Sequence, residues 1–136
     1  MSIWKQTVDI AALNAARHGT MLETIGIEFT GYTDTTLSAR MPVDARTVQP
    51  YGILHGGASA TLAETLGSMA ASCSQEDKKV VGIELNINHL RQVTEGWITG
   101  VTSAIRIGRR VQVWEIRMTD DREKLVSVAR LTTLVV

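Results

Sequence analysis

One stretch in the middle of the chain combines residue types that can act on a carbonyl group. The run from Gln49 to Ala58 reads QPYGILHGGA and enters a segment with helical spacing, in which Glu64 and Ser68 follow. The first N–H groups of a helix lack partners within it and lie at its positive end. Such groups can hold an anion or a developing oxyanion, and paired glycines let a ligand approach the backbone. A carboxylate within the helix could act as a base or a nucleophile.

Each of these residues also has a purely structural interpretation. Gly56 and Gly57 could simply form a tight turn, and Glu64 could mark a solvent-facing stripe of its helix. No Lys or Arg occurs in the helix to pair with Glu64, which favours a functional role because an unpaired carboxylate is costly to enclose. Histidines such as His55 and His89, taken singly, are more often structural than catalytic.

Composition excludes several classes of function. The chain has 136 residues, which suits a single domain over 1–136, and its 14 Lys+Arg balance 14 Asp+Glu. A neutral chain lacks the bulk charge that would attract nucleic acid or a membrane surface, so an anionic partner needs a local cluster of cations. The single cysteine, Cys73, excludes an internal disulfide and argues against a zinc site built on cysteines. No signal-peptide pattern, metal-ligand spacing or phosphate loop is present, so we expect a cytoplasmic protein without metal or cofactor.

Hydrophobic periodicity predicts an α+β fold with one long helix. Leu62, Leu66, Met69 and Cys73 recur at helical spacing, and this helix has a mostly small, apolar surface that suits enclosure by a sheet. Short gaps between the later strands favour hairpins and therefore an antiparallel sheet. The predicted helices are 9–16, capped by Asp9 and stopped by Gly19, then 21–24 and 56–73. The predicted strands are 25–29 and 35–41, joined across Gly31-Tyr32, then 80–90, 97–107, 111–119 and 125–135. Within 80–90, one face is predicted to hold Val81, Ile83, Leu85 and Ile87.

The combined motif resembles the hotdog-fold thioesterases. The run QPYGILHGGAS from Gln49, followed by LAETLGS from Leu62, carries the resemblance, which extends nearly from end to end. Met41-Pro42-Val43-Asp44, Val80-Val81-Gly82, Asn88-His89 and Leu131-Thr132-Thr133 also match. The match is best within the subgroup of 1,4-dihydroxy-2-naphthoyl-CoA hydrolase and the enterobactin-pathway proofreading thioesterase, which is related to 4-hydroxybenzoyl-CoA and phenylacetate-pathway thioesterases. This resemblance implies a hotdog fold, in which an antiparallel sheet wraps one central helix.

The resemblance also implies roles for individual residues. Glu64 matches the catalytic carboxylate, Gln49 the amide that polarises the thioester carbonyl, and Gly56 a backbone N–H that holds the oxyanion. His55 matches the histidine beside the thioester, and Ser68 the hydroxyl that orients water. The residues expected to bind substrate are Met69, Gly82, His89, Arg91, Gln92, Arg106, Gly108, Arg109 and Arg110. The arginines are the densest basic cluster and could hold coenzyme A phosphates, or could belong to a solvated hairpin.

The resemblance implies hydrolysis of an aromatic acyl-CoA, with 1,4-dihydroxy-2-naphthoyl-CoA of menaquinone synthesis as the leading substrate. Release of misloaded acyl groups from an aryl carrier protein is an alternative, because Thr65 to Met69 resembles the proofreading branch. A non-catalytic module that binds acyl-CoA is a third interpretation, disfavoured because Glu64, Gln49 and His55 are all present. The resemblance further implies a homotetramer made of two dimers, with active sites shared between chains.

Overall fold

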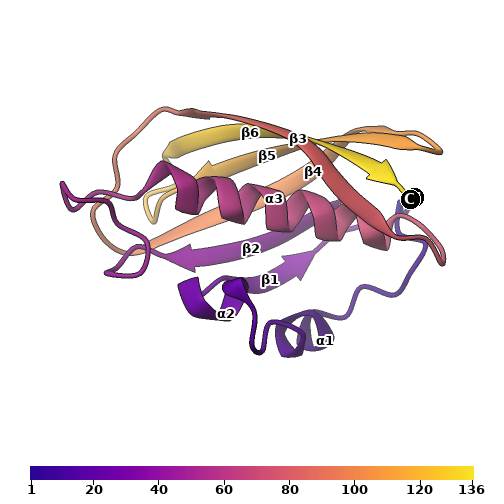
Figure 1. Cartoon of the computed structure of the whole chain (residues 1–136), viewed down its shortest axis with the longest axis horizontal. Helices are drawn as coiled ribbons and strands as arrows, with labels where there is room; N and C mark the ends of the chain where they lie inside the picture. The colour runs from indigo at the N-terminus through magenta and orange to yellow at the C-terminus, as the bar shows by residue number, and fades with distance from the viewer.

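One long helix, α3 (Gly56–Cys73), packs against a six-stranded antiparallel sheet (Figure 1). The computed structural model describes residues 1–136, and the strand order across the sheet is β1-β2-β4-β5-β6-β3. The strands are β1 (Glu28–Tyr32), β2 (Thr36–Pro42), β3 (Val80–His89), β4 (Trp97–Ile107), β5 (Val111–Thr119) and β6 (Leu125–Val135). Two short helices, α1 (Ile10–Ala15) and α2 (Met21–Ile25), lie beyond the β1 edge. The predicted hotdog architecture is confirmed.

The core lies between the concave face of the sheet and the inward face of α3. Leu62 and Leu66 of the helix are fully buried, as are Ile98, Trp114 and Leu131 of the sheet. Each such side chain contributes about 1.5–3 kcal/mol by leaving water, so this layer fixes how the helix lies across the strands. None of the three helices combines the length and apolarity that a bilayer crossing needs.

The helix is covered by the sheet on one side only, so the prediction of an enclosed helix needs correction. Gly57 and Glu64 are exposed, and Thr61, Thr65 and Ser68 are only half-buried. These residues form a stripe along the outer side of α3, at the helical spacing of three to four residues. The small side chains that suggested enclosure therefore serve two surfaces, one against the sheet and one that is open in the single chain.

Three details of the strand predictions are wrong. Gly31 and Tyr32 belong to β1 and pair with β2, and the connection between the strands lies at 33–35. The predicted strand start at Ile25 falls inside α2. A bulge between Gly82 and Glu84 shifts the register of β3, so Val81 and Ile83 are exposed while Leu85 and Ile87 pack inward. A bulge adds an extra residue that inverts the side-chain alternation, which a strictly alternating pattern cannot anticipate.

Candidate active site

The N-terminal end of α3 presents a free backbone donor. His55 is the N-cap, and its Nδ1 accepts a hydrogen bond of 2.7 Å from the Gly57 N–H. An acceptor at Nδ1 leaves the proton of the neutral imidazole on Nε2. The N–H groups of Ala58 and Ser59 donate to the His55 carbonyl, whereas the Gly56 N–H has no partner in the chain. A free N–H at the positive end of an 18-residue helix is suited to hold an oxyanion.

The side-chain amide of Gln49 is oriented as a second donor. Its Oε1 accepts from the Tyr51 N–H, and this contact fixes which end of the amide is the oxygen because a backbone N–H can only donate. The Gln49 Nε2 has no hydrogen-bond partner in the chain, so its N–H groups are free to bind an acceptor on a ligand. Backbone bonds from Gln49 N–H to the Ile53 carbonyl (2.9 Å) and from Gly52 N–H to the Gln49 carbonyl (2.8 Å) hold the loop itself.

A cleft of about 360 Å³ joins these donors to the end of β3. Its lining includes five of the predicted site residues, which are Gln49, Gly56, His89, Arg91 and Gln92. His89 lies directly against the helix start, since a Cβ on Gly56 would come within 2.7 Å of the imidazole Nε2. Only glycine allows this approach, so the sequence at the helix entry is adapted to the histidine that ends β3.

Glu64 lies further along α3, against Gly82 of β3. A Cβ on Gly82 would lie 2.8 Å from Glu64 Oε2 and 2.9 Å from Oε1, so the absent side chain makes room for the carboxylate. Glu64 forms no ion pair, and partial desolvation against the sheet raises the pKa of its carboxyl group although the residue stays exposed in the single chain. Ser68 follows one turn later, whereas Met69 points about 140° away around the helix and packs against the core.

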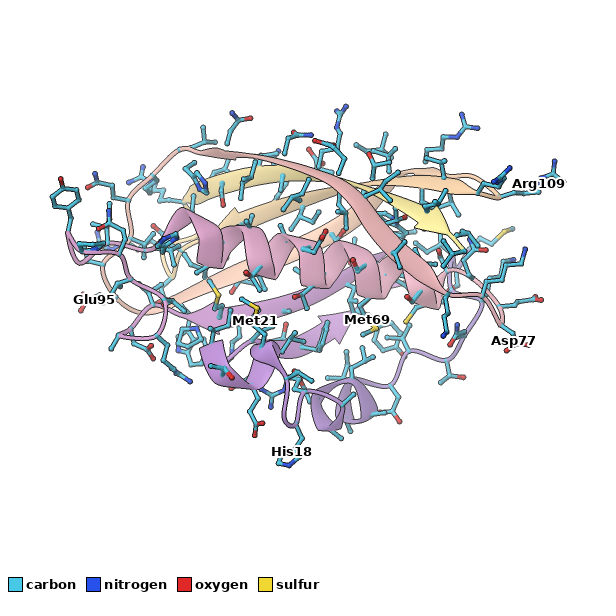
Figure 2. All side chains as sticks on the ribbon, viewed as in Figure 1. His18, Met21, Met69, Asp77, Glu95 and Arg109 are labelled. Carbon is cyan, nitrogen blue, oxygen red and sulfur yellow. The ribbon has the colours of Figure 1, made fainter.

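Three of the four predicted arginines line a second cleft, of about 800 Å³, at the other end of the molecule. Arg91 lines the first cleft instead, so the four arginines do not form one cluster within a chain. Arg106, Gly108, Arg109 and Arg110 line the second cleft with Lys78, and Figure 2 shows Arg109 at the hairpin tip and Glu95 at the opposite end. None of these four cations is in an ion pair with a carboxylate. Their charge is therefore available to an anionic ligand such as a phosphate.

One chain does not bring the predicted residues together. Glu64 lies eight residues after Gly56, and so about 12 Å further along the helix axis at ~1.5 Å per residue. A base and an oxyanion donor must both lie near 3 Å from one reacting group. The donors therefore gather at one end of α3, the carboxylate lies in the middle, and the basic cleft lies beyond its C-terminal end.

Two contributors escaped the sequence-based prediction. Lys78 lines the basic cleft, and the charged run from Glu76 to Lys79 directly after the helix was the signal that could have identified it. The Tyr51 N–H orients the Gln49 amide, and no sequence pattern shows a contact between a side chain and a backbone group two residues later.

Comparison with known proteins gives the family. The family model described as the thioesterase superfamily matches residues 51–127. The chain is 46% identical over 134 residues to 1,4-dihydroxy-2-naphthoyl-CoA hydrolase of Escherichia coli, and 48% identical over 134 residues to the proofreading thioesterase EntH of Cronobacter turicensis. Each alignment covers 98% of this chain and 98% of the relative. A crystal structure of a Q49A mutant thioesterase from Pseudomonas aeruginosa superimposes with a TM-score of 0.98 at 46% identity, covering 99% of both chains.

The two relatives match nearly the whole chain, and the family model matches more than half of it. They favour an enzyme over a non-catalytic binding module, since the family and both relatives are named for hydrolysis. The chain belongs to the thioesterase superfamily and is a thioesterase with the hotdog fold.

Proposed function

We propose that this thioesterase hydrolyses an aromatic acyl-CoA, with 1,4-dihydroxy-2-naphthoyl-CoA as the leading substrate, in an active site built from two chains. The observation that carries the proposal is the pair of unpartnered donors, Gly56 N–H and Gln49 Nε2, beside one cleft. Two such donors match the needs of a carbonyl oxygen that becomes negative during attack. The Escherichia coli relative, at 46% identity, is named 1,4-dihydroxy-2-naphthoyl-CoA hydrolase after the proposed substrate.

Pairing of two β3 strands would complete the site. β3 is an edge strand that bonds only to β6, and its exposed Val81 and Ile83 leave an unprotected apolar edge. Antiparallel pairing of β3 with its copy brings the Gly82 end of one strand beside the His89 end of the other. Since Glu64 contacts Gly82 and Gly56 contacts His89, Glu64 of the partner subunit approaches the free donors. We therefore expect light scattering to show at least a dimer.

The chemistry follows from these positions. In the general-base route, Glu64 removes a proton from water as the water oxygen bonds to the thioester carbon. Gly56 and Gln49 hold the resulting oxyanion, whose collapse breaks the C–S bond and expels the coenzyme A thiolate. The proton on Glu64 is then released, leaving the acid and free thiol. In the nucleophilic route, Glu64 itself bonds to the carbon and water hydrolyses the resulting anhydride. A single turnover in heavy-oxygen water separates the routes, since only the nucleophilic one exchanges a Glu64 oxygen.

The basic cleft supports coenzyme A as the carrier of the acyl group. The same two-fold pairing places the hairpin end of one chain near Arg91 and Gln92 of the other, because each chain is reversed relative to its partner. The free cations Lys78, Arg106 and Arg109 would then face the nucleotide phosphates of a substrate whose thioester lies at Gly56.

Mixed dimers test the two-chain site. We expect Gln49→Ala and Glu64→Gln homodimers to be nearly inactive, whereas their co-expression restores roughly one quarter of wild-type activity. Half of the dimers are then mixed, and each mixed dimer has one site with both residues intact. The matched control for assembly is co-expression of wild-type chains with chains that carry both Gln49→Ala and Glu64→Gln. No recovery on co-expression would contradict the shared site and place both residues in the same chain's site.

A carrier-protein thioester is the second candidate substrate. The segment Thr65 to Met69 resembles the proofreading branch, and the relative named EntH is as similar to this chain as the hydrolase is. Steady-state kinetics on dihydroxynaphthoyl-, benzoyl- and fatty acyl-CoA, beside an acylated aryl carrier protein, separate the candidates. We expect the highest kcat/KM on dihydroxynaphthoyl-CoA. A higher value on the carrier protein would transfer the assignment to proofreading.

A further inference from the structure

A third cleft lies between α2 and the first turns of α3, and it has no part in the mechanism above. Its volume is about 330 Å³, and we call it the α2 cleft. Small-molecule sites of this size are typically lined by apolar side chains with a few polar groups that orient the ligand. Figure 2 shows Met21 between the two helices. The apolar wall is formed by Met21, Ile25, Val48 and Ala58.

The polar side chains of the α2 cleft are satisfied within the chain, with one exception. Arg46 is paired with Asp44 at 2.7 Å, so its charge is already neutralised. The hydroxyls of Thr47 and Thr61 donate to backbone carbonyls at 2.7 and 2.9 Å. The exception is His55, whose Nδ1 accepts from a backbone N–H and whose Nε2–H has no partner in the chain. The cleft therefore offers one free donor among apolar walls.

Gly57 holds this donor in place before any ligand arrives. The Gly57 N–H donates to His55 Nδ1, which leaves the proton of the neutral ring on Nε2. A Cβ on Gly57 would lie 2.9 Å from both Nδ1 and Cε1 of the imidazole, so only glycine lets the ring pack over the helix start. The direction of the free N–H is thus fixed by the chain itself.

The α2 cleft begins one residue away from the oxyanion donor. Gly56 lines the cleft that holds Gln49, whereas Gly57 lines the α2 cleft, and their Cα atoms lie about 3.8 Å apart. Gly57 is exposed and carries no side chain, so it does not obstruct the way from one cleft to the other. A thioester whose carbonyl oxygen lies at the Gly56 N–H can therefore place its acyl group over Gly57 and into the α2 cleft.

We propose that the α2 cleft binds the acyl group of the substrate, and that His55 Nε2–H donates to an oxygen substituent on an aryl ring held there. Met21 and Ile25 would then determine which rings fit, since a methionine thioether is adaptable and packs well against aromatic groups. This inference rests on the proposed function, because it takes the thioester carbonyl to lie at Gly56. It narrows the substrate class to aryl thioesters with a hydroxyl or similar oxygen on the ring.

Filling the cleft tests where the acyl group lies. Met21 is 59% exposed, so Met21→Trp adds bulk to the cleft without disturbing the core. We expect kcat/KM for 2-naphthoyl-CoA to fall at least about tenfold. The value for acetyl-CoA should hold, because an acetyl group is too short to enter the cleft, and this activity also reports that the enzyme is folded. Thr24→Trp is the matched control, since Thr24 is an exposed residue of the same helix outside the cleft.

Shortening the donor tests the contact with the ring oxygen. His55→Asn keeps a favoured N-cap residue at the start of α3 but cannot place an N–H where Nε2 lies. We expect the ratio of kcat/KM for dihydroxynaphthoyl-CoA to that for 2-naphthoyl-CoA to fall about tenfold, as on loss of one hydrogen bond. Because both substrates share the reacting thioester, any general loss of rate cancels in this ratio.

The outcomes separate this inference from the proposed function. A Met21→Trp enzyme with unchanged turnover of 2-naphthoyl-CoA, or with equal losses on acetyl-CoA, would overturn the placement of the acyl group. An unchanged ratio in His55→Asn would overturn the contact with the ring oxygen. In either case a wild-type preference for aryl over acetyl thioesters leaves the proposed function standing. A wild-type enzyme that lacks this preference would refute both.

Discussion

Replacing Gln49 with alanine tests the assignment of the oxyanion donors most directly. The substitution deletes one donor whose Nε2 has no partner in the resting chain. Loss of one such donor costs ~100- to 1,000-fold in kcat, or about 3–4 kcal/mol of transition-state stabilisation. The loop keeps both of its backbone bonds, from Gln49 to Ile53 and from Gly52 to Gln49, since neither involves the side chain. Only the bond to the Tyr51 N–H is lost, which is worth about 0.5–1.5 kcal/mol of stability.

The expected loss of transition-state stabilisation is therefore larger than the expected loss of folding stability, and experiment can separate the two. We expect kcat to fall far more than KM changes, because the bond to the oxygen strengthens in the transition state. The melting temperature should change little, because the two backbone hydrogen bonds of the loop remain. Kinetics and thermal unfolding of the same preparation provide all three values. A nearly intact kcat with a raised KM and a lower melting temperature would mean that Gln49 only braces the loop.

Three further predictions rest on the same geometry. Glu64→Gln should lower turnover ~100- to 10,000-fold without unfolding the protein. In the wild type, burial disfavours the charged carboxylate and raises its pKa, so Glu64 is protonated at a higher pH than an ordinary glutamate and activity should be lost as pH falls through that raised pKa. A pH–rate profile whose acid limb lies in the ordinary range would contradict this environment. Alanine at both Arg109 and Arg110 should raise KM for acyl-CoA and have little effect on a pantetheine thioester that lacks the nucleotide; equal losses on both substrates would rule out a phosphate contact.

Local patterns predicted the parts of the fold that a single periodicity controls. The bounds of α3, β4, β5 and β6 match the prediction, because long runs with one clear period dominate those segments. The bulge in β3 was missed, since an inserted residue at Ile83 keeps the apolar composition and changes only the register. The β1–β2 connection was misplaced because Gly31 suggests a turn, although in this sheet it pairs with Ser38.

Site residues were predicted individually, but their spatial grouping was not. The sequence placed Gln49, His55 and Gly56 at a helix entry, and the structure gathers Gln49 and Gly56 around one cleft with His89. The roles themselves came from the family resemblance and stay predictions. The close approach of Glu64 to Gly82 depends on how α3 lies across β3, which no local pattern encodes.

Strand β3 contacts both parts of the proposed site, the carboxylate and the oxyanion donors, and it also forms an edge of the sheet where two chains could pair. β3 touches α3 through two close contacts, Gly82 with Glu64 and His89 with Gly56, and each needs a glycine where the groups meet. The same strand has the free edge of the sheet. In the proposed dimer, a two-fold axis at that edge would place the two contacts side by side and bring the carboxylate of one chain to the donors of the other. Catalysis at this site would therefore require chain pairing, and a substitution on the β3 edge would affect turnover without touching the substrate.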